Sequence, residues 1–178
     1  MSLQHSESKR FSKKNPAVRT ELAMAGQAVM IRAIVGDQGQ ELQMGATSDM
    51  DAASVATILD YHSPVRLTRM EKTGYTSAVL GQEEVAGQPC IVLEFTKGET
   101  VETYWFRMED GLLIQQRRPA LDGTMATESM DQYLVFGDNG LKLPATKSST
   151  VAGQSMIVRT ASATFNPEFA ANAFELQP

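Results

Sequence analysis

The chain has 178 residues, of which 42% are hydrophobic and 21% are charged, and its formal net charge is −5. A chain of this size buries enough surface to fold without a disulfide or a structural metal. The acidic balance argues against nucleic-acid binding, which is typical of clustered lysine and arginine, and no apolar run is long enough to be a transmembrane segment. Composition therefore predicts one ordinary globular domain and says nothing more specific about its function.

The N-terminal stretch is polar and basic. Residues 1–15 are expected to be an N-terminal tag or a partial edge segment, and in the second case residues Gln4 to Lys14 supply a strand. The lysines there favour a solvated, protected strand edge over contact with anionic lipid. The first six residues lack the apolar segment of a secretion signal. Residues 16–178 are expected to form a single domain.

Most of the chain alternates apolar and polar residues with a period of two, which predicts β-strands. Turns such as Ala25-Gly26 and Ala86-Gly87 separate the segments, and connections this short make sequential strands antiparallel neighbours. The sequence therefore predicts an antiparallel meander. Its expected strands are Ala17 to Ala25, Gln27 to Val35, Glu41 to Met44, Ser77 to Val85, Pro89 to Thr96, Thr100 to Met108, Leu112 to Arg118, Thr127 to Phe136, Leu141 to Ser149 and Gln154 to Phe165.

Two helices are predicted to interrupt the strands. Ser48 and Asp51 have the spacing of an N-terminal cap, and the apolar residues that follow have helical spacing until Pro64. Near the C-terminus, residues 166–174 predict a short helix capped by Asn166, with a proline at its first position and two phenylalanines to bury.

The predicted strands carry large apolar groups on both faces. In Thr100 to Met108, one face holds Val101 and Trp105 while the other holds Tyr104 and Phe106. In a single-layer sheet with one solvent-exposed face, apolar and polar residues alternate more strictly along each strand. This sheet must therefore curl or be covered. The predicted fold class is mainly β with a few helices: a strongly curved antiparallel sheet, in the form of an unclosed half β-barrel, with a helical lid.

Catalytic and metal-binding motifs are absent from the sequence. Cys90 lies in an apolar run and is interpreted as a small buried hydrophobe, and His5 and His62 are too far apart to suggest a pair. The stretch Gln115 to Arg118 is interpreted as a polar strand edge. We therefore expect no enzyme, no metal site and no cofactor.

Four segments occur in a characteristic order along the chain: Val79 to Leu93, Tyr104 to Leu113, Gly140 to Pro144 and Phe165 to Pro167, followed by Phe174. This ordered set resembles the LolA/LolB-like superfamily, the periplasmic lipoprotein carriers and their outer-membrane lipoprotein-sorting relatives. The resemblance covers residues 16–178. It implies an unclosed antiparallel β-barrel whose helices form a lid over a hydrophobic cavity, and binding of lipid or acyl chains without catalysis.

Two positions depart from the pattern of that family. Arg107 stands in a hairpin where the family commonly has an aspartate. The best-studied carriers have an Arg-Pro pair before their second strand, and that arginine contacts the lid; this chain has Asn15-Pro16 there, with Arg19 three residues on. Arg19 is therefore included among the candidate ligand-binding residues.

The first functional hypothesis is a periplasmic carrier or sensor that holds lipid or lipoprotein acyl chains in an apolar cavity. Its partners would be a lipid or acyl-chain ligand and a lipoprotein or outer-membrane assembly protein, with no nucleic acid. Apolar burial would supply the affinity. Besides Arg19, the residues expected to line the cavity are Met24, Met30, Leu93, Phe95, Trp105, Phe106 and Leu134.

The second hypothesis is an accessory interaction module of a larger periplasmic protein, such as a zinc peptidase whose metal motif lies in another domain. The gene around this sequence would discriminate between the two. A second domain with a His-x-x-Glu-His motif favours the module, and a signal peptide or lipobox with a short extension favours the carrier.

Overall fold

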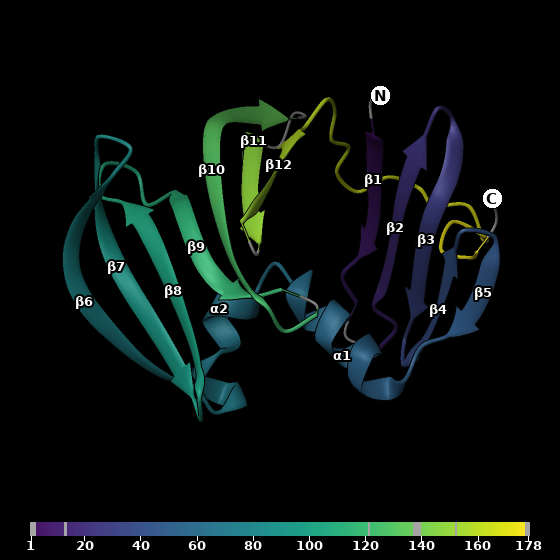
Figure 1. Cartoon of the computed structure of the whole chain (residues 1–178), viewed down its shortest axis with the longest axis horizontal. Coiled ribbons are helices and arrows are strands. Elements are labelled where there is room, and N and C mark those ends of the chain that lie inside the picture. Colours follow the sequence, from purple (N-terminus) through teal and green to yellow (C-terminus); the bar gives the residue numbers. More distant parts are fainter. Residues whose placement is uncertain (1–2, 13, 121, 137–139, 152, 177–178) are drawn as a thin grey trace. The chain divides into compact units, whose positions relative to one another are not determined.

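The computed structural model describes residues 3–12, 14–120, 122–136, 140–151 and 153–176. In this part of the chain, twelve strands form two antiparallel sheets, and neither sheet closes into a barrel (Figure 1). The prediction of a mainly β, antiparallel and unclosed fold is confirmed, although the strands are shared between two sheets. The chain divides into two compact units, Met1–Leu67 with Glu168–Pro178, and Thr68–Pro167.

The first unit contains a five-stranded sheet and a helix. Residues 3–10, whose role the sequence left open, form its edge strand and pair with the next strand in register from Leu3–Met24 to Arg10–Ala17. One strand, residues 46–49, escaped prediction because all four of its side chains are exposed and show no apolar alternation. The elements are β1 (Leu3–Arg10), β2 (Ala17–Met24), β3 (Gln27–Val35), β4 (Gln38–Gln43), β5 (Ala46–Asp49) and α1 (Ala52–Tyr61).

Helix α1 packs on one face of this sheet, and its core contains Ile34, Val55 and Ile58. The predicted helix is confirmed, but its cap is Asp51, whose carboxylate accepts a hydrogen bond from the Ser54 backbone N–H at 2.9 Å. Ser48 lies in β5, because the edge of the sheet continues to Asp49. The apolar spacing therefore predicted the helix correctly, but the prediction that Ser48 caps it was wrong, because Asp51 is the capping residue.

The opposite face of the same sheet is covered by the C-terminal segment. Arg10 stacks on the Phe174 ring with its guanidinium carbon 5.0 Å from the ring centroid, and Arg19 donates a hydrogen bond from Nε to the Glu175 carbonyl oxygen at 3.3 Å. Ile31 and Phe174 are buried. In Figure 1 this segment, drawn in yellow, runs beside the strands of the first unit.

The predicted C-terminal helix is not formed in residues 160–176, which adopt turns and irregular backbone. Asn166 has a φ of 52°, in the left-handed region, whereas a helix N-cap has extended backbone. Phe169 and Phe174 are five residues apart, so they would not share one helix face. They instead pack against each other with ring centroids 4.8 Å apart. Packing on the sheet therefore replaces helical burial here.

The second unit contains a seven-stranded meander in the order β12-β11-β10-β9-β8-β7-β6. All of the strands predicted between residues 77 and 165 are present, and the largest difference is at the last, which ends at Arg159 instead of Phe165. The strands are β6 (Thr76–Val85), β7 (Gln88–Lys97), β8 (Thr100–Arg107), β9 (Leu113–Pro119), β10 (Met125–Phe136), β11 (Leu141–Val151) and β12 (Gln154–Arg159).

Short helical turns lead into this second sheet. Helix α2 (Arg66–Arg69) crosses the boundary between the two units, and the 3-10 turn η1 (Glu71–Thr73) follows it. Gly74 then turns the chain into β6 with a φ of 92°, a left-handed conformation that glycine adopts without strain. Helix α1 thus covers one sheet face of the first unit, while a lid over a cavity stays a prediction.

Gly39 permits the close approach of α1 to β4, and this contact is testable. A Cβ at position 39 would lie 2.7 Å from Val55 Cγ2 and 3.2 Å from Ile34 Cγ1. We expect Gly39→Ala to lower the free energy of unfolding by about 1–3 kcal/mol because it overpacks this core. Chemical denaturation followed by circular dichroism measures the change. Gln38→Ala, at the exposed neighbouring position, is the control, and equal stability of both variants would refute the proposed close contact.

Candidate ligand-binding face of the seven-stranded sheet

The register of β7, β8 and β9 defines two faces of the second sheet. Residues directly opposite each other on antiparallel strands share a face, and neighbours along a strand alternate. One face, here called face A, carries Leu93 opposite Tyr104 and Ile91 opposite Phe106. The other, face B, carries Val92 opposite Trp105, Trp105 opposite Gln115 and Thr103 opposite Arg117.

Face A exposes a continuous apolar strip across its first three strands. Val79 on β6 pairs with Leu93, and Ile91 pairs with Phe106. Val79 is 69% exposed and Ile91 38% exposed, while Leu93 and Phe106 are half-buried. These four residues are called the face A strip below. They present accessible hydrocarbon on side chains from three adjacent strands.

A buried polar cluster lies beside this strip on the same face. Glu102 is only 2% exposed, and it accepts hydrogen bonds from the Tyr104 hydroxyl at 2.6 Å and from the Tyr75 hydroxyl at 3.1 Å. Phe95, directly opposite Glu102, packs edge-on against Tyr104 with ring centroids 5.8 Å apart. The two hydroxyls stabilise a carboxylate that would be costly to bury alone.

The turn that contains η1 closes the strip at the Phe95 end. Met70 is 2% exposed, and Tyr75 reaches down from this turn to Glu102. Lys97 holds the turn from β7, since its Nζ donates to the Thr73 carbonyl oxygen at 2.8 Å and lies 5.5 Å from the Tyr75 ring centroid. The turn is therefore fixed to the sheet by polar contacts around one buried methionine.

Strand β9 corrects one expectation from the sequence. Gln116 and Arg118 were interpreted as part of a polar edge, but β9 is the middle strand of the sheet and both residues are buried on face A. The Gln116 side-chain amide donates a hydrogen bond to the Glu128 carboxylate on β10. A polar run in the sequence marks a sheet edge only when no further strand pairs with it. Here β10 pairs with β9, so the run lies inside the sheet.

The predicted ligand-binding residues of the second unit fall into three groups. Leu93, Phe95 and Phe106 share face A, as the alternation along their strands implies. Trp105 lies on face B, because neighbours on one strand point to opposite faces. Leu134, 53% exposed, lies where β10 and β11 extend as a two-stranded ribbon, since the pairing of β9 with β10 ends at Ser129.

The remaining predicted residues belong to the first unit. Met24 is 41% exposed at the end of β2, and Met30 is half-buried in β3. Arg19 makes an ion pair with Glu21, with Nη2 2.7 Å from Oε2, in addition to its hydrogen bond to the C-terminal segment. The role of Arg19 in this unit is thus the attachment of that segment to the sheet.

Sequence reasoning missed two kinds of residue in this site. Ile91 and Val79 extend the strip, and Ile91 was detectable because it alternates with Leu93 and Phe95. Val79 is identified only by the register that pairs it with Leu93. The Tyr75–Glu102 contact joins residues 27 positions apart, and no local pattern indicates it.

Among the residues that the structure describes, no three histidine, cysteine, aspartate or glutamate side chains come together in a way that could hold a metal ion. In the same part of the chain, no helix has both the length and the hydropathy needed to cross a membrane.

No protein-family model matches the sequence, and no curated protein matches it. The fold is similar to that of a candidate outer membrane lipoprotein-sorting protein domain from Vibrio parahaemolyticus, with a TM-score of 0.63 and 14% identity over 97% of this chain and 80% of that chain. It is also similar to a DUF1329 family protein from Desulfovibrio piger, with a TM-score of 0.65 and 11% identity over 97% of this chain and 80% of the other. These likenesses show that this chain shares the fold of those two proteins, which confirms the resemblance to outer-membrane lipoprotein-sorting proteins at the level of fold.

The hairpin between β8 and β9, which follows Trp105 and Phe106, is closed by an ion pair. Arg107 donates from Nε to Asp110 Oδ1 at 2.8 Å and from Nη2 to Oδ2 at 2.6 Å, and its Nη1 donates to Gln88 Oε1 at 2.8 Å. The hydrogen bonds from Arg107 lower the pKa of Asp110 to about 2. Arginine at position 107 thus joins the hairpin to the start of β7.

This ion pair predicts a pH dependence of stability. Because the pKa of Asp110 is depressed in the folded state, its contribution is present above the ordinary carboxyl pKa of 3.8 and is lost as the pH falls through about 2. We expect Asp110→Asn to be less stable than the wild type at neutral pH, and this difference to shrink over that acidic window. Urea unfolding midpoints measured across the pH range give the result. A difference that stayed constant down to the acidic limit would contradict it.

Proposed function

We propose that this protein binds the acyl chain of a lipid or lipoprotein on face A, without catalysis, as a carrier or sensor in outer-membrane lipoprotein sorting. The observation that carries the proposal is the face A strip, an accessible apolar surface on an antiparallel sheet of LolA-like fold. Exposed apolar side chains that adjoin across three strands are a recognition surface rather than scattered surface residues.

The energetics of hydrocarbon burial support this role. Each buried methylene contributes about 0.8 kcal/mol, so an acyl chain covering roughly eight methylenes gains about 6 kcal/mol before ordering costs. No ion pair is needed for that gain. The strip residues are rigidly held by the β-ladder, while Val79 and Ile91 keep enough exposure to contact a ligand.

Binding without catalysis agrees with the chemistry of the site. The buried carboxylate of Glu102 accepts hydrogen bonds from the hydroxyls of Tyr75 and Tyr104, which hold it in a fixed position. A periplasmic location and a lipoprotein partner belong to the same proposal. They rest on the likeness of the fold to the candidate lipoprotein-sorting domain.

Apolar residues outside the strip belong to the proposal in a secondary role. Leu134 would extend the surface along the ribbon of β10 and β11, which is tied to the start of β9 because the Tyr133 hydroxyl donates to the Leu113 carbonyl oxygen at 2.6 Å. Phe95, which is buried and packs against Tyr104, forms the closed end.

A charge placed in the strip tests acyl binding. We expect Leu93→Glu to weaken binding of a fluorescent fatty-acid probe at least about tenfold, because a carboxylate in contact with hydrocarbon must be desolvated. Fluorescence titration of the purified full chain measures the dissociation constant. The circular dichroism spectrum of the variant establishes that it is folded.

Ile157→Glu is the matched control. Ile157 is 57% exposed on β12, opposite Ser148 on face B, so a carboxylate there should leave acyl binding unchanged. Equal loss in both variants would assign binding to general surface hydrophobicity, and a wild type that takes up no acyl probe would refute the proposed function.

A further inference from the structure

The side chain of Trp105 lies across face B of the second sheet. Its indole Nε1 donates to Glu83 Oε2 at 2.7 Å, and these residues belong to β8 and β6, which flank β7. The indole therefore passes over β7, where Cys90 and Val92 are 0% and 1% exposed. Trp105 itself is half-buried. Part of the indole is therefore accessible to a ligand.

Polar side chains continue from Trp105 across the neighbouring strands of face B. The register places Gln115 opposite Trp105, Ser129 opposite Gln115, and Ser148 opposite Ser129. The adjacent row, two residues along, consists of Thr103, Arg117, Thr127 and Thr150. Amide, hydroxyl and guanidinium groups therefore extend sideways from one accessible aromatic ring.

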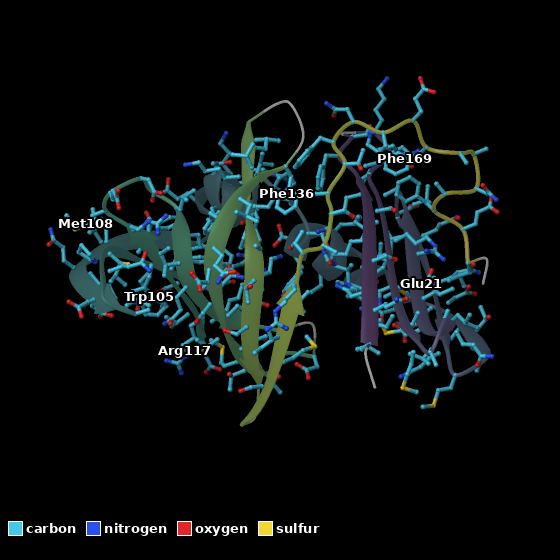
Figure 2. The ribbon with its side chains drawn as sticks, turned by 90° about the horizontal axis from the view of Figure 1, so that it is seen from above. Glu21, Trp105, Met108, Arg117, Phe136 and Phe169 are labelled. Atoms are coloured by element: carbon cyan, nitrogen blue, oxygen red, sulfur yellow. The ribbon has the colours of Figure 1, made fainter. Side chains whose placement is uncertain are left out.

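The geometry of this row brings the polar groups within reach of a ligand on the ring. Gln115 and Ser129 already contact each other, with Ser129 Oγ 3.5 Å from Gln115 Oε1, and Arg117 is exposed. Trp105 and Arg117 lie on the same side of the ribbon in Figure 2. Arg117 is diagonal to Trp105, a separation of about 7–8 Å between backbones that long side chains bridge.

This combination fits one ligand chemistry. A pyranose ring offers a flat patch of C–H groups that packs on an aromatic face, and a rim of hydroxyls that exchange hydrogen bonds with amide, carboxylate and guanidinium groups. The polar rows do not suit an acyl chain. The Glu83 carboxylate at the edge of the indole and the net charge of −5 disfavour the phosphates of a nucleic acid.

We propose that Trp105, with Gln115 and Arg117 beside it, forms a binding site for a pyranose sugar of a glycan on face B. The site is separate from the face A strip, because Trp105 and Phe106 point to opposite sides of one strand. Trp105 provides the stacking platform, Gln115 and Arg117 bond the hydroxyls, and Glu83 fixes the ring orientation.

The test uses the intrinsic fluorescence of Trp105, which is the single tryptophan in the chain. The full chain is titrated with cellotriose and with tri-N-acetylchitotriose, two flat β-linked probes. We expect a saturable change in tryptophan emission with at least one of them. We expect Gln115→Ala and Arg117→Ala each to weaken that binding about fivefold, the loss of one hydrogen bond.

Lys147→Ala is the matched control. Lys147 is an exposed basic residue opposite Met130 on face A, so its removal should leave sugar binding unchanged. A fatty-acid probe should not compete with the sugar. Sugar binding on face B and acyl binding on face A can therefore be confirmed or refuted independently. No saturable change with either sugar, or full affinity in both Gln115→Ala and Arg117→Ala, would overturn the proposal. These variants keep Trp105 in place over Cys90 and Val92, and so they preserve the packing beneath the ring.

Discussion

The strict alternation of side chains along an antiparallel strand is the constraint on which the second sheet depends. Trp105 and Phe106 are adjacent in sequence, yet in the pairing of β7 with β8 Trp105 lies opposite Val92 on one face and Phe106 lies opposite Ile91 on the other. A sheet with large apolar groups at successive positions must therefore use both faces. Face A combines an apolar strip with a closed end, and face B combines one aromatic ring with rows of polar groups.

The buried Glu102 shows how the two parts of face A are joined. Its carboxylate binds Tyr104 from its own strand and Tyr75 from the turn before β6, so a polar contact fixes the position of this turn, which also contains the buried Met70. An apolar contact alone would not specify that position, because dispersion has no preferred direction. The cluster thus orients the turn, and the strip beyond it stays accessible.

The first unit obeys the same constraint with different partners. Its sheet also buries residues on both faces: Ile34 lies under α1, and Ile31 lies on the face that the C-terminal segment covers. The close packing of α1 requires a glycine at position 39, and the other face depends on Arg10 and Arg19. Arg19 was predicted as a ligand-binding residue from its place in the family pattern. In the structure it donates a hydrogen bond to the Glu175 carbonyl oxygen in the C-terminal segment.

Periodicity in the sequence determined β2 to β4, β6 to β12, their antiparallel order and α1, because these depend on contacts between residues close in the chain. It also placed Leu93 and Phe95 on one face, and the turn at Ala25-Gly26 has the left-handed backbone expected of it. Tertiary structure alone decided the burial of Gln116 and Arg118, the pairing of Tyr75 with Glu102, and the irregular path of the C-terminal segment. Each of these depends on which distant segment covers a given side chain. A local pattern of apolar and polar residues does not specify that segment.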